Sequence, residues 1–183
     1  MEGFLANSDT FLCEIGNVPA NHKVPFEHWV SFDESAGGYW LVEARPTERA
    51  KEGKLVLVKP SGHNANWEIG VVRWKKESET GAPALGVERL SDAPKQVNLS
   101  VVDSDGETGA IIKGLFLPKL YQRVINSSLI MEPADYQEDQ LLDMHYRNNI
   151  IRIRLTEIVD NSDDWVRAHF EVQGHAPGQG KPG

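Results

Sequence analysis

The chain has 183 residues, of which 40% are hydrophobic and 25% are charged. This composition is typical of globular proteins and excludes wholesale disorder, and the length suffices for two small domains with their own cores. The formal net charge of -8, from 19 basic and 27 acidic residues, disfavours DNA and RNA partners because phosphates are repelled.

The sequence contains neither a run of about 18 apolar residues, as a membrane helix needs, nor a signal peptide. We therefore expect no membrane insertion and a cytoplasmic location. The single cysteine, Cys13, excludes an internal disulfide and fits a reducing compartment.

The first part of the chain alternates short β-type runs with clusters of Gly, Pro, Asn and Ser. A helix is compatible with residues 11–15, inside an N-terminal segment at residues 1–27. A first domain at residues 28–92 is predicted to contain strands at 29–32, 39–43, 54–59, 67–74 and 84–90.

Asp92-Ala93-Pro94 indicates a domain boundary, and a second all-β domain is predicted at residues 93–174. Ile151, Ile153 and Leu155 alternate with arginine and threonine, as in a half-buried antiparallel strand. A helix is compatible only with residues 119–125, and residues 175–183 are predicted to be a disordered tail. The second domain has predicted strands at 96–102, 110–117, 128–131, 140–146, 149–158 and 165–172.

The fold class that follows is all-β, with an antiparallel β-barrel followed by a second small β-barrel-like domain. Closed barrels are favoured because they leave no sheet edge exposed to aggregation. The two halves share no sequence motif, so two different barrels are expected.

The turn Asp33-Glu34-Ser35-Ala36-Gly37-Gly38 is the strongest candidate for a binding site. Short polar side chains and free backbone N–H groups meet in such a turn, and small anions are bound by turns of this kind. The segment 28–92 is also nearly neutral, with nine basic against ten acidic residues, whereas 93–175 has eight against thirteen. The first domain is therefore the better host for an anion.

Four elements in order, Asp33-x-Ser35-x-x-Gly38, Gly53-x-Leu55-Val56, the strand 67–74 and Leu85-Gly86-Val87-Glu88, resemble the PilZ domain over residues 28–92. PilZ domains are bacterial receptors for cyclic di-GMP built as small antiparallel β-barrels. The resemblance implies that Asp33 and Ser35 contact a guanine edge and that Gly38 permits the turn. A carboxylate can accept hydrogen bonds from guanine N–H groups, and a hydroxyl can donate and accept.

The family's second motif, an R-x-x-x-R upstream of this turn, is missing. The upstream region offers only His22, Lys23 and His28 as cations, and lysine lacks the planar fork that binds phosphate in a bidentate way. Arg45 and Arg49 have the right spacing but follow the turn, so we interpret the match as coincidental. Two possibilities stay open: the barrel has lost nucleotide binding, or it binds with other cations such as Lys23 or Arg73.

Catalytic and metal sites are not expected. Cys13 lies between apolar residues, as a buried structural thiol does. The six histidines form no zinc motif, and Asp103-Ser104-Asp105-Gly106-Glu107 lacks the spacing of a calcium loop. The five tryptophans are predicted to pack in barrel cores.

We therefore expect a non-enzymatic signalling module of PilZ type, without a cofactor. It would bind cyclic di-GMP weakly, or it would have lost that ligand and act through a protein partner. The alternative is a nucleotide-independent interaction adaptor built on the same barrel.

Overall fold

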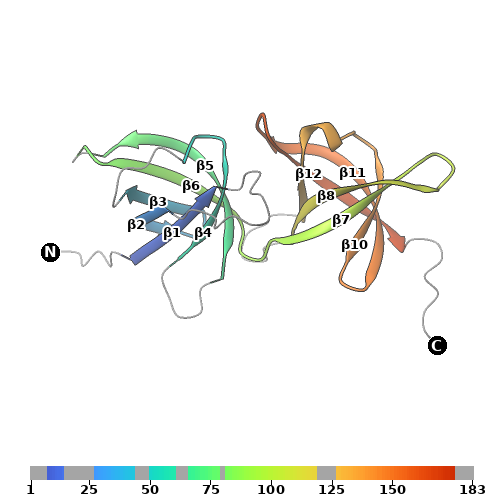
Figure 1. Cartoon of the computed structure of the whole chain (residues 1–183), viewed down its shortest axis with the longest axis horizontal. Coiled ribbons are helices and arrows are strands. Elements are labelled where there is room, and N and C mark those ends of the chain that lie inside the picture. Colours follow the sequence, from blue (N-terminus) through green and yellow to red (C-terminus); the bar gives the residue numbers. More distant parts are fainter. Residues whose placement is uncertain are drawn as a thin grey trace, which may run out of the picture. The chain divides into compact units, whose positions relative to one another are not determined.

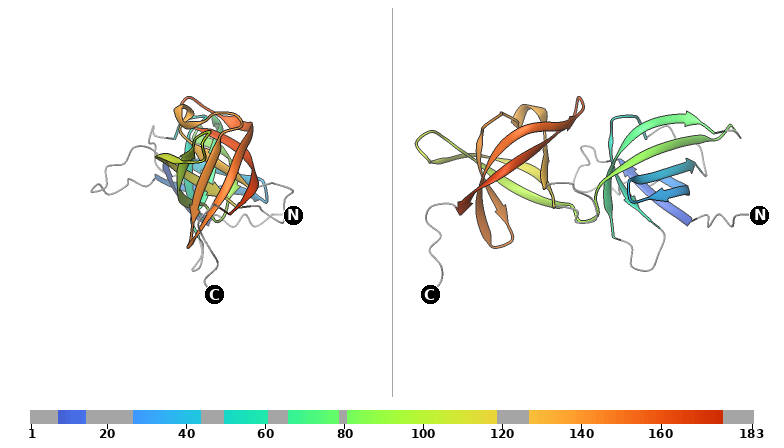
Figure 2. Two further views of the ribbon diagram at one scale, coloured as in Figure 1. Left: turned by 90° about the vertical axis from the view of Figure 1, so that its right-hand side faces the viewer. Right: turned by 180° about the vertical axis from the view of Figure 1, so that it is seen from behind.

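The computed structural model describes residues 8–14, 27–43, 50–60, 66–78, 81–118 and 127–175. The chain divides into two compact units, Met1–Ala93 and Pro94–Gly183, and each contains a closed antiparallel β-barrel (Figures 1 and 2). In the described residues, the only helical element is a single 3-10 turn, Pro133–Asp135. The predicted all-β fold class is confirmed.

The first barrel has six strands. Strands β2 to β6 form a curled sheet in the order β2-β3-β6-β5-β4, and β1 closes it by pairing with both β2 and β4. The strands are β1 (Ser8–Glu14), β2 (Glu27–Ser35), β3 (Gly38–Glu43), β4 (Leu55–Lys59), β5 (Glu68–Glu77) and β6 (Pro83–Ser91).

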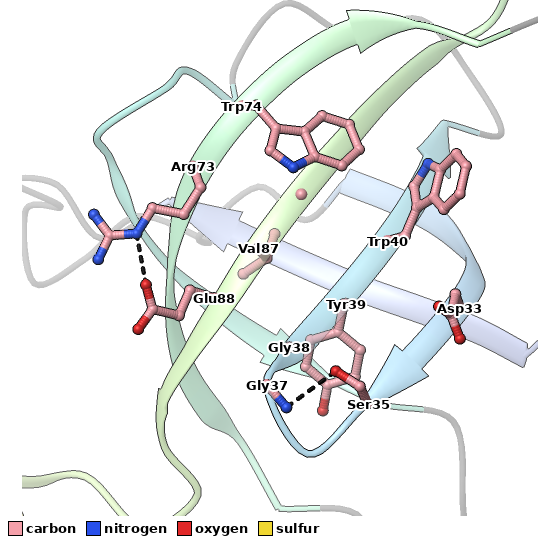
Figure 3. A pocket seen from close by; sticks show the side chains of 11 residues that line it. Asp33, Ser35, Gly37, Gly38, Tyr39, Trp40, Arg73, Trp74, Val87 and Glu88 are labelled. Carbon is pink, nitrogen blue, oxygen red and sulfur yellow. Dashed lines mark hydrogen bonds and ion pairs between the residues drawn. The ribbon is translucent and has the colours of Figure 1, made fainter. Parts of the chain in front are cut away.

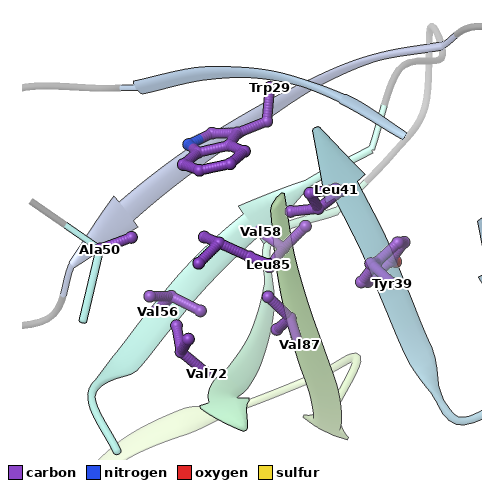
Figure 4. Packing of buried hydrophobic residues seen from close by; sticks show 9 residues of the cluster. All are labelled: Trp29, Tyr39, Leu41, Ala50, Val56, Val58, Val72, Leu85 and Val87. Carbon is purple, nitrogen blue, oxygen red and sulfur yellow. The ribbon is translucent and has the colours of Figure 1, made fainter. Parts of the chain in front are cut away.

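The core of this barrel comes from residues that alternate along the strands (Figure 4). Tyr39 and Leu41 of β3 and Leu85 and Val87 of β6 are buried, and each fully buried apolar side chain contributes about 1.5–3 kcal/mol. Because neighbouring residues of a strand point to opposite faces, Trp40 and Gly86 face outward. The core cluster comprises Trp29, Tyr39, Leu41, Ala50, Val56, Val58, Val72, Leu85 and Val87.

The second barrel repeats the strand order of the first. Its order is β7-β8-β9-β12-β11-β10, so in both barrels the third strand pairs with the sixth and the first with the fourth. The predicted alternation in β11 is confirmed, since Ile153 and Leu155 are fully buried and Arg152 is only partly so. The strands are β7 (Lys95–Val102), β8 (Thr108–Leu117), β9 (Ser128–Met131), β10 (Leu141–Tyr146), β11 (Asn149–Asn161) and β12 (Val166–His175).

The helix considered for residues 11–15 is wrong, because Ser8–Glu14 is strand β1. Its backbone groups pair with two neighbouring strands, whereas so short a helix is marginal in water. The second helix considered, at 119–125, lies outside the described residues. So does the predicted tail beyond His175, the last residue of β12.

Candidate ligand-binding site on the first barrel

The site is built on one row of residues that crosses four strands. Asp33 of β2 is opposite Trp40 of β3, Trp40 is opposite Gly86 of β6, and Gly86 is opposite Trp74 of β5. Residues directly opposite in neighbouring strands are side by side on one face of the sheet. Strand register therefore brings a carboxylate and two indoles, from distant parts of the sequence, together on the outside of the barrel.

The next row contains the hairpin turn between β2 and β3. Ser35 is paired with Gly38, and the Ser35 Oγ accepts a hydrogen bond from the backbone N–H of Gly37 at 3.0 Å. The Gly37 carbonyl in turn accepts from the backbone N–H of Arg89 at 2.9 Å. The turn is thus held both by its own serine and by strand β6.

Two glycines create a hollow between these rows. Gly38 has a φ of +152°, and a Cβ atom there would lie 1.9 Å from the Val87 carbonyl oxygen. A Cβ atom on Gly86 would lie 2.1 Å from the Trp74 indole, so the indole rests directly on the Gly86 backbone. The resulting open pocket of about 300 Å³ is lined by Asp33, Ser35, Gly37, Gly38, Tyr39, Trp40, Arg73, Trp74, Gly86, Val87 and Glu88 (Figure 3).

One ion pair lies at the wall of the pocket. Arg73 occupies a bulge between Val72 and Trp74, and its Nε donates to Glu88 Oε2 at 2.7 Å. The two side chains are 38% and 40% exposed, so the pair is open to solvent and stabilises the fold little. The pocket therefore contains a cation and, next to it, a carboxylate that partly neutralises the cation.

A network of charged side chains connects the turn to strands β5 and β6. The Arg89 guanidinium forms ion pairs with Glu34 and Glu68 and donates a hydrogen bond to the Tyr39 hydroxyl oxygen. Tyr39 donates its own proton to Glu68 at 2.6 Å. Burial, followed by the hydrogen bond to Glu68, raises the pKa of Tyr39. Burial alone would lower the pKa of Arg89, but Tyr39 and the two carboxylates raise it, so the guanidinium stays charged.

An aromatic cluster extends from the pocket along the outer face. Phe32 and Trp40 have ring centroids 4.6 Å apart, and Trp40 and Trp74 meet edge to face at 6.2 Å. Among the described residues, the enclosed Trp40 Nε1 has no hydrogen-bond partner, which costs about 1–3 kcal/mol.

These residues can be compared with known proteins. A family model described as the middle PilZ domain of the cyclic-di-GMP receptor FimW matches residues 16–95. Residues 16–95 of this chain are a PilZ domain. The match spans strands β2 to β6 and so includes every residue that lines the pocket. Searches of curated proteins and of solved structures gave no match.

The three residues predicted to form the PilZ site, Asp33, Ser35 and Gly38, lie together at the pocket, and Arg73 joins them. The other cations considered, His22, Lys23, Arg45 and Arg49, lie outside the described residues, as does the side chain of His28. The part that Glu88 plays at the PilZ pocket was not predicted. Alternation with Val87, a core residue, could have placed its carboxylate on the outer face.

The prediction of core tryptophans holds for Trp29 and Trp165, which are buried, but is wrong for Trp40, Trp67 and Trp74, which are half-buried. Trp40 and Trp74 line the pocket of the PilZ domain. Trp40 lies between the buried Tyr39 and Leu41, and this alternation could have shown that it faces outward.

Within the described ranges, no group of three or more His, Cys, Asp or Glu side chains could hold a metal ion. The same residues include no helix long and apolar enough to span a membrane.

Proposed function

We propose that the PilZ domain is a non-enzymatic module that binds cyclic di-GMP weakly, with one guanine in the pocket beside Gly38. The observation that carries this proposal is that Asp33 and Ser35 are both exposed on β2 at the edge of the same hollow. A carboxylate accepts from the N–H groups of guanine, and the Ser35 hydroxyl, whose oxygen already accepts from Gly37, has a proton to donate.

Weak rather than tight binding follows from the charges. Arg73 supplies a guanidinium to the pocket, which suits a phosphate because of its planar donors. Glu88 competes for that guanidinium at 2.7 Å, and its negative charge also repels a phosphate. A single partly neutralised arginine is a poorer phosphate site than a pair of free arginines would be.

A second candidate is an interaction adaptor that needs no nucleotide. It is favoured by the acidic side chains at the turn, Glu34 and Glu88, which disfavour an anionic ligand, and by Phe32, which is 42% exposed. In this case a protein partner contacts the barrel. A cytoplasmic location stays a prediction under both candidates.

Calorimetric titration of the full chain with cyclic di-GMP tests the first candidate. We expect measurable heat, and at least about tenfold weaker binding in Asp33→Ala, because hydrogen bonds to a charged group are lost. Asp92→Ala, an exposed aspartate on the same barrel and outside the pocket, is the matched control and should bind like the wild type. Neither heat nor a thermal shift at millimolar cyclic di-GMP would overturn the proposal.

Affinity capture distinguishes the adaptor. A partner that is retained by Asp33→Ala in nucleotide-free extract supports nucleotide-independent binding. A partner that is captured only when cyclic di-GMP is added refutes the adaptor.

A further inference from the structure

We call the aromatic cluster beside the pocket, which consists of Phe32, Trp40 and Trp74, the aromatic shelf. Its two tryptophans line the pocket, and Phe32 extends the apolar surface beyond it. Indoles on the outside of a barrel contribute less to its core than buried ones do. Position 86 accepts only glycine, because a Cβ atom there would lie 2.1 Å from the Trp74 indole. The rings are tilted against one another, by 54° between Phe32 and Trp40 and by 75° between Trp40 and Trp74, so the shelf offers a single indole face, that of Trp74, beside the place where the proposed guanine would lie.

Lys76 lies above the shelf. Its Nζ is 4.6 Å from the Trp74 ring centroid and 5.1 Å from that of Trp40. Lys76 is exposed, and in the part of the chain that the structure describes it has no carboxylate partner. A cation–π contact at an exposed site is weak, so the ammonium can move to a stronger partner at little cost.

Arg73 and Lys76 differ in this respect. Arg73 is partly neutralised by Glu88, whereas the ammonium of Lys76 lies over aromatic rings and is available to an anion. Both residues belong to β5 and flank Trp74, so a base on the indole has a cation on each side. Nucleobases stack on aromatic side chains whatever their sequence, because every base has a π-face.

We propose that Trp74, assisted by Trp40, stacks the base of the bound nucleotide, and that Lys76 leaves the rings to bind its phosphate. This inference rests on the proposed function and assigns to Lys76 the phosphate contact that the missing upstream arginines would make. It names residues that determine affinity for a planar base carrying a phosphate, in addition to the edge contacts of Asp33 and Ser35.

The test uses the full chain with two probes, cyclic di-GMP and 5′-GMP, followed by calorimetry and by the indole N–H signals in NMR spectra. We expect Trp74→Leu to weaken binding at least about tenfold, in line with the loss of one stacked base. Lys76→Met should weaken it about three- to tenfold and make the affinity less dependent on salt, because one phosphate contact is lost.

Matched controls exist on the same barrel. Lys59 lies over Trp67 at 5.7 Å, and neither residue lines the pocket. Trp67→Leu and Lys59→Met remove the same kinds of groups and should leave the affinity unchanged. Thermal unfolding of each variant checks that it folds, and the exposed Lys76→Met variant tests the proposal even if Trp74→Leu does not fold.

The outcomes separate the inference from the proposed function. Cyclic di-GMP binding that is equal in wild type, Trp74→Leu and Lys76→Met overturns the inference and leaves the receptor function standing. Perturbation of the Trp40 and Trp74 signals by 5′-GMP, without any response to cyclic di-GMP, supports the shelf and overturns the receptor function. Absence of a response to both probes overturns both.

Discussion

The two barrels have the same strand order but different outer faces. In the first, the outward positions of β5 and β6 include Trp74 and Gly86, and the missing Cβ atom lets the indole lie flush on the β6 backbone beside the pocket. The corresponding strands of the second barrel are β11 and β12. There the Arg154–Glu171 pair, at 2.6 Å, and the contact between His169 and Glu157, at 3.4 Å, fill the surface with long side chains.

Polar groups of the second barrel also bind one another. The buried Asp143 accepts two hydrogen bonds from Arg152, at 2.8 and 2.9 Å, and Ser100 contacts His145 at 2.9 Å. The first barrel has such contacts too, around Arg89, but at its pocket the Asp33 side chain is exposed and the Lys76 ammonium lies over aromatic rings. The two barrels therefore share a topology but differ in the glycine positions and the polar partners of their outer faces, on which the proposed binding depends.

Gly38→Ala should produce the largest effect, because it places a side chain where the first barrel has room only for a glycine. The new Cβ atom would lie 1.9 Å from the Val87 carbonyl oxygen, at a φ of +152° that disfavours side chains. We expect a loss of about 3 kcal/mol in the stability of the first barrel. Hydrogen exchange of strands β3 and β6 measures it, because a chain of two units need not unfold in one step.

The control for this variant is Gly109→Ala in the second barrel. A Cβ atom there would have its nearest neighbour at 3.8 Å, and we expect a change within about 0.5 kcal/mol. Equal exchange rates in wild type and Gly38→Ala would contradict the role given to Gly38.

Tyr39→Phe should have an intermediate effect. It removes the hydroxyl that joins Arg89 and Glu68, at a cost of about 1–2 kcal/mol at pH 7. The raised pKa of Tyr39 means that its neutral form stabilises the fold fully below the unfolded pKa, about 10. That contribution is lost as the pH rises from about 10 through the higher folded pKa.

Denaturation of wild type and Tyr39→Phe at pH 7 and above pH 10 checks this prediction. The difference in stability between them should shrink at the higher pH. Tyr146→Phe in the second barrel is the control for loss of a tyrosine hydroxyl. A stability difference between wild type and Tyr39→Phe that grows with pH would contradict the predicted pH dependence.

Glu88→Gln should have the smallest effect on stability, below about 1 kcal/mol, because its ion pair with Arg73 is exposed. It removes a negative charge from the pocket and frees the guanidinium, so we expect cyclic di-GMP to bind about three- to tenfold more tightly. Glu171→Gln, which breaks a surface pair of the second barrel, should leave binding unchanged. Weaker binding in Glu88→Gln would mean that the carboxylate contacts the ligand.

Local sequence patterns predicted most of the strands, because alternation and turn residues depend on residues that are adjacent in the sequence. The alternation of Ile151, Ile153 and Leu155 identified β11, and the turn residues located the hairpin at Asp33 and Gly38. The predicted site residues Asp33, Ser35 and Gly38 lie within six residues of sequence, so a single hairpin turn places them next to one another. The closing strand β1 was missed because a short apolar run around Phe11 and Leu12 fits a helix as well as a strand, and only its pairing with β2 and β4 decides between the two.

Trp74 shows why the rest of the site could not be predicted. Val72 is a core residue, and strict alternation would place Trp74, two positions later, on the inside as well. The bulge between Val72 and Trp74 adds one residue and turns the indole outward. A bulge depends on how two strands pair, which single-strand patterns do not show.

The amino-acid sequence is enough to predict the all-β class, the hairpin that bears Asp33 and Ser35, and the resemblance of residues 28–92 to the PilZ domain. The row that joins Trp40, Gly86 and Trp74 to Asp33, the ion pair of Arg73 with Glu88 and the position of Lys76 over the indoles become visible only in the folded chain. The pairing register of the strands sets these positions. Strand register joins residues that are distant in sequence through backbone pairing, and it places Gly38 against the Val87 backbone and Gly86 beneath the Trp74 indole at the pocket.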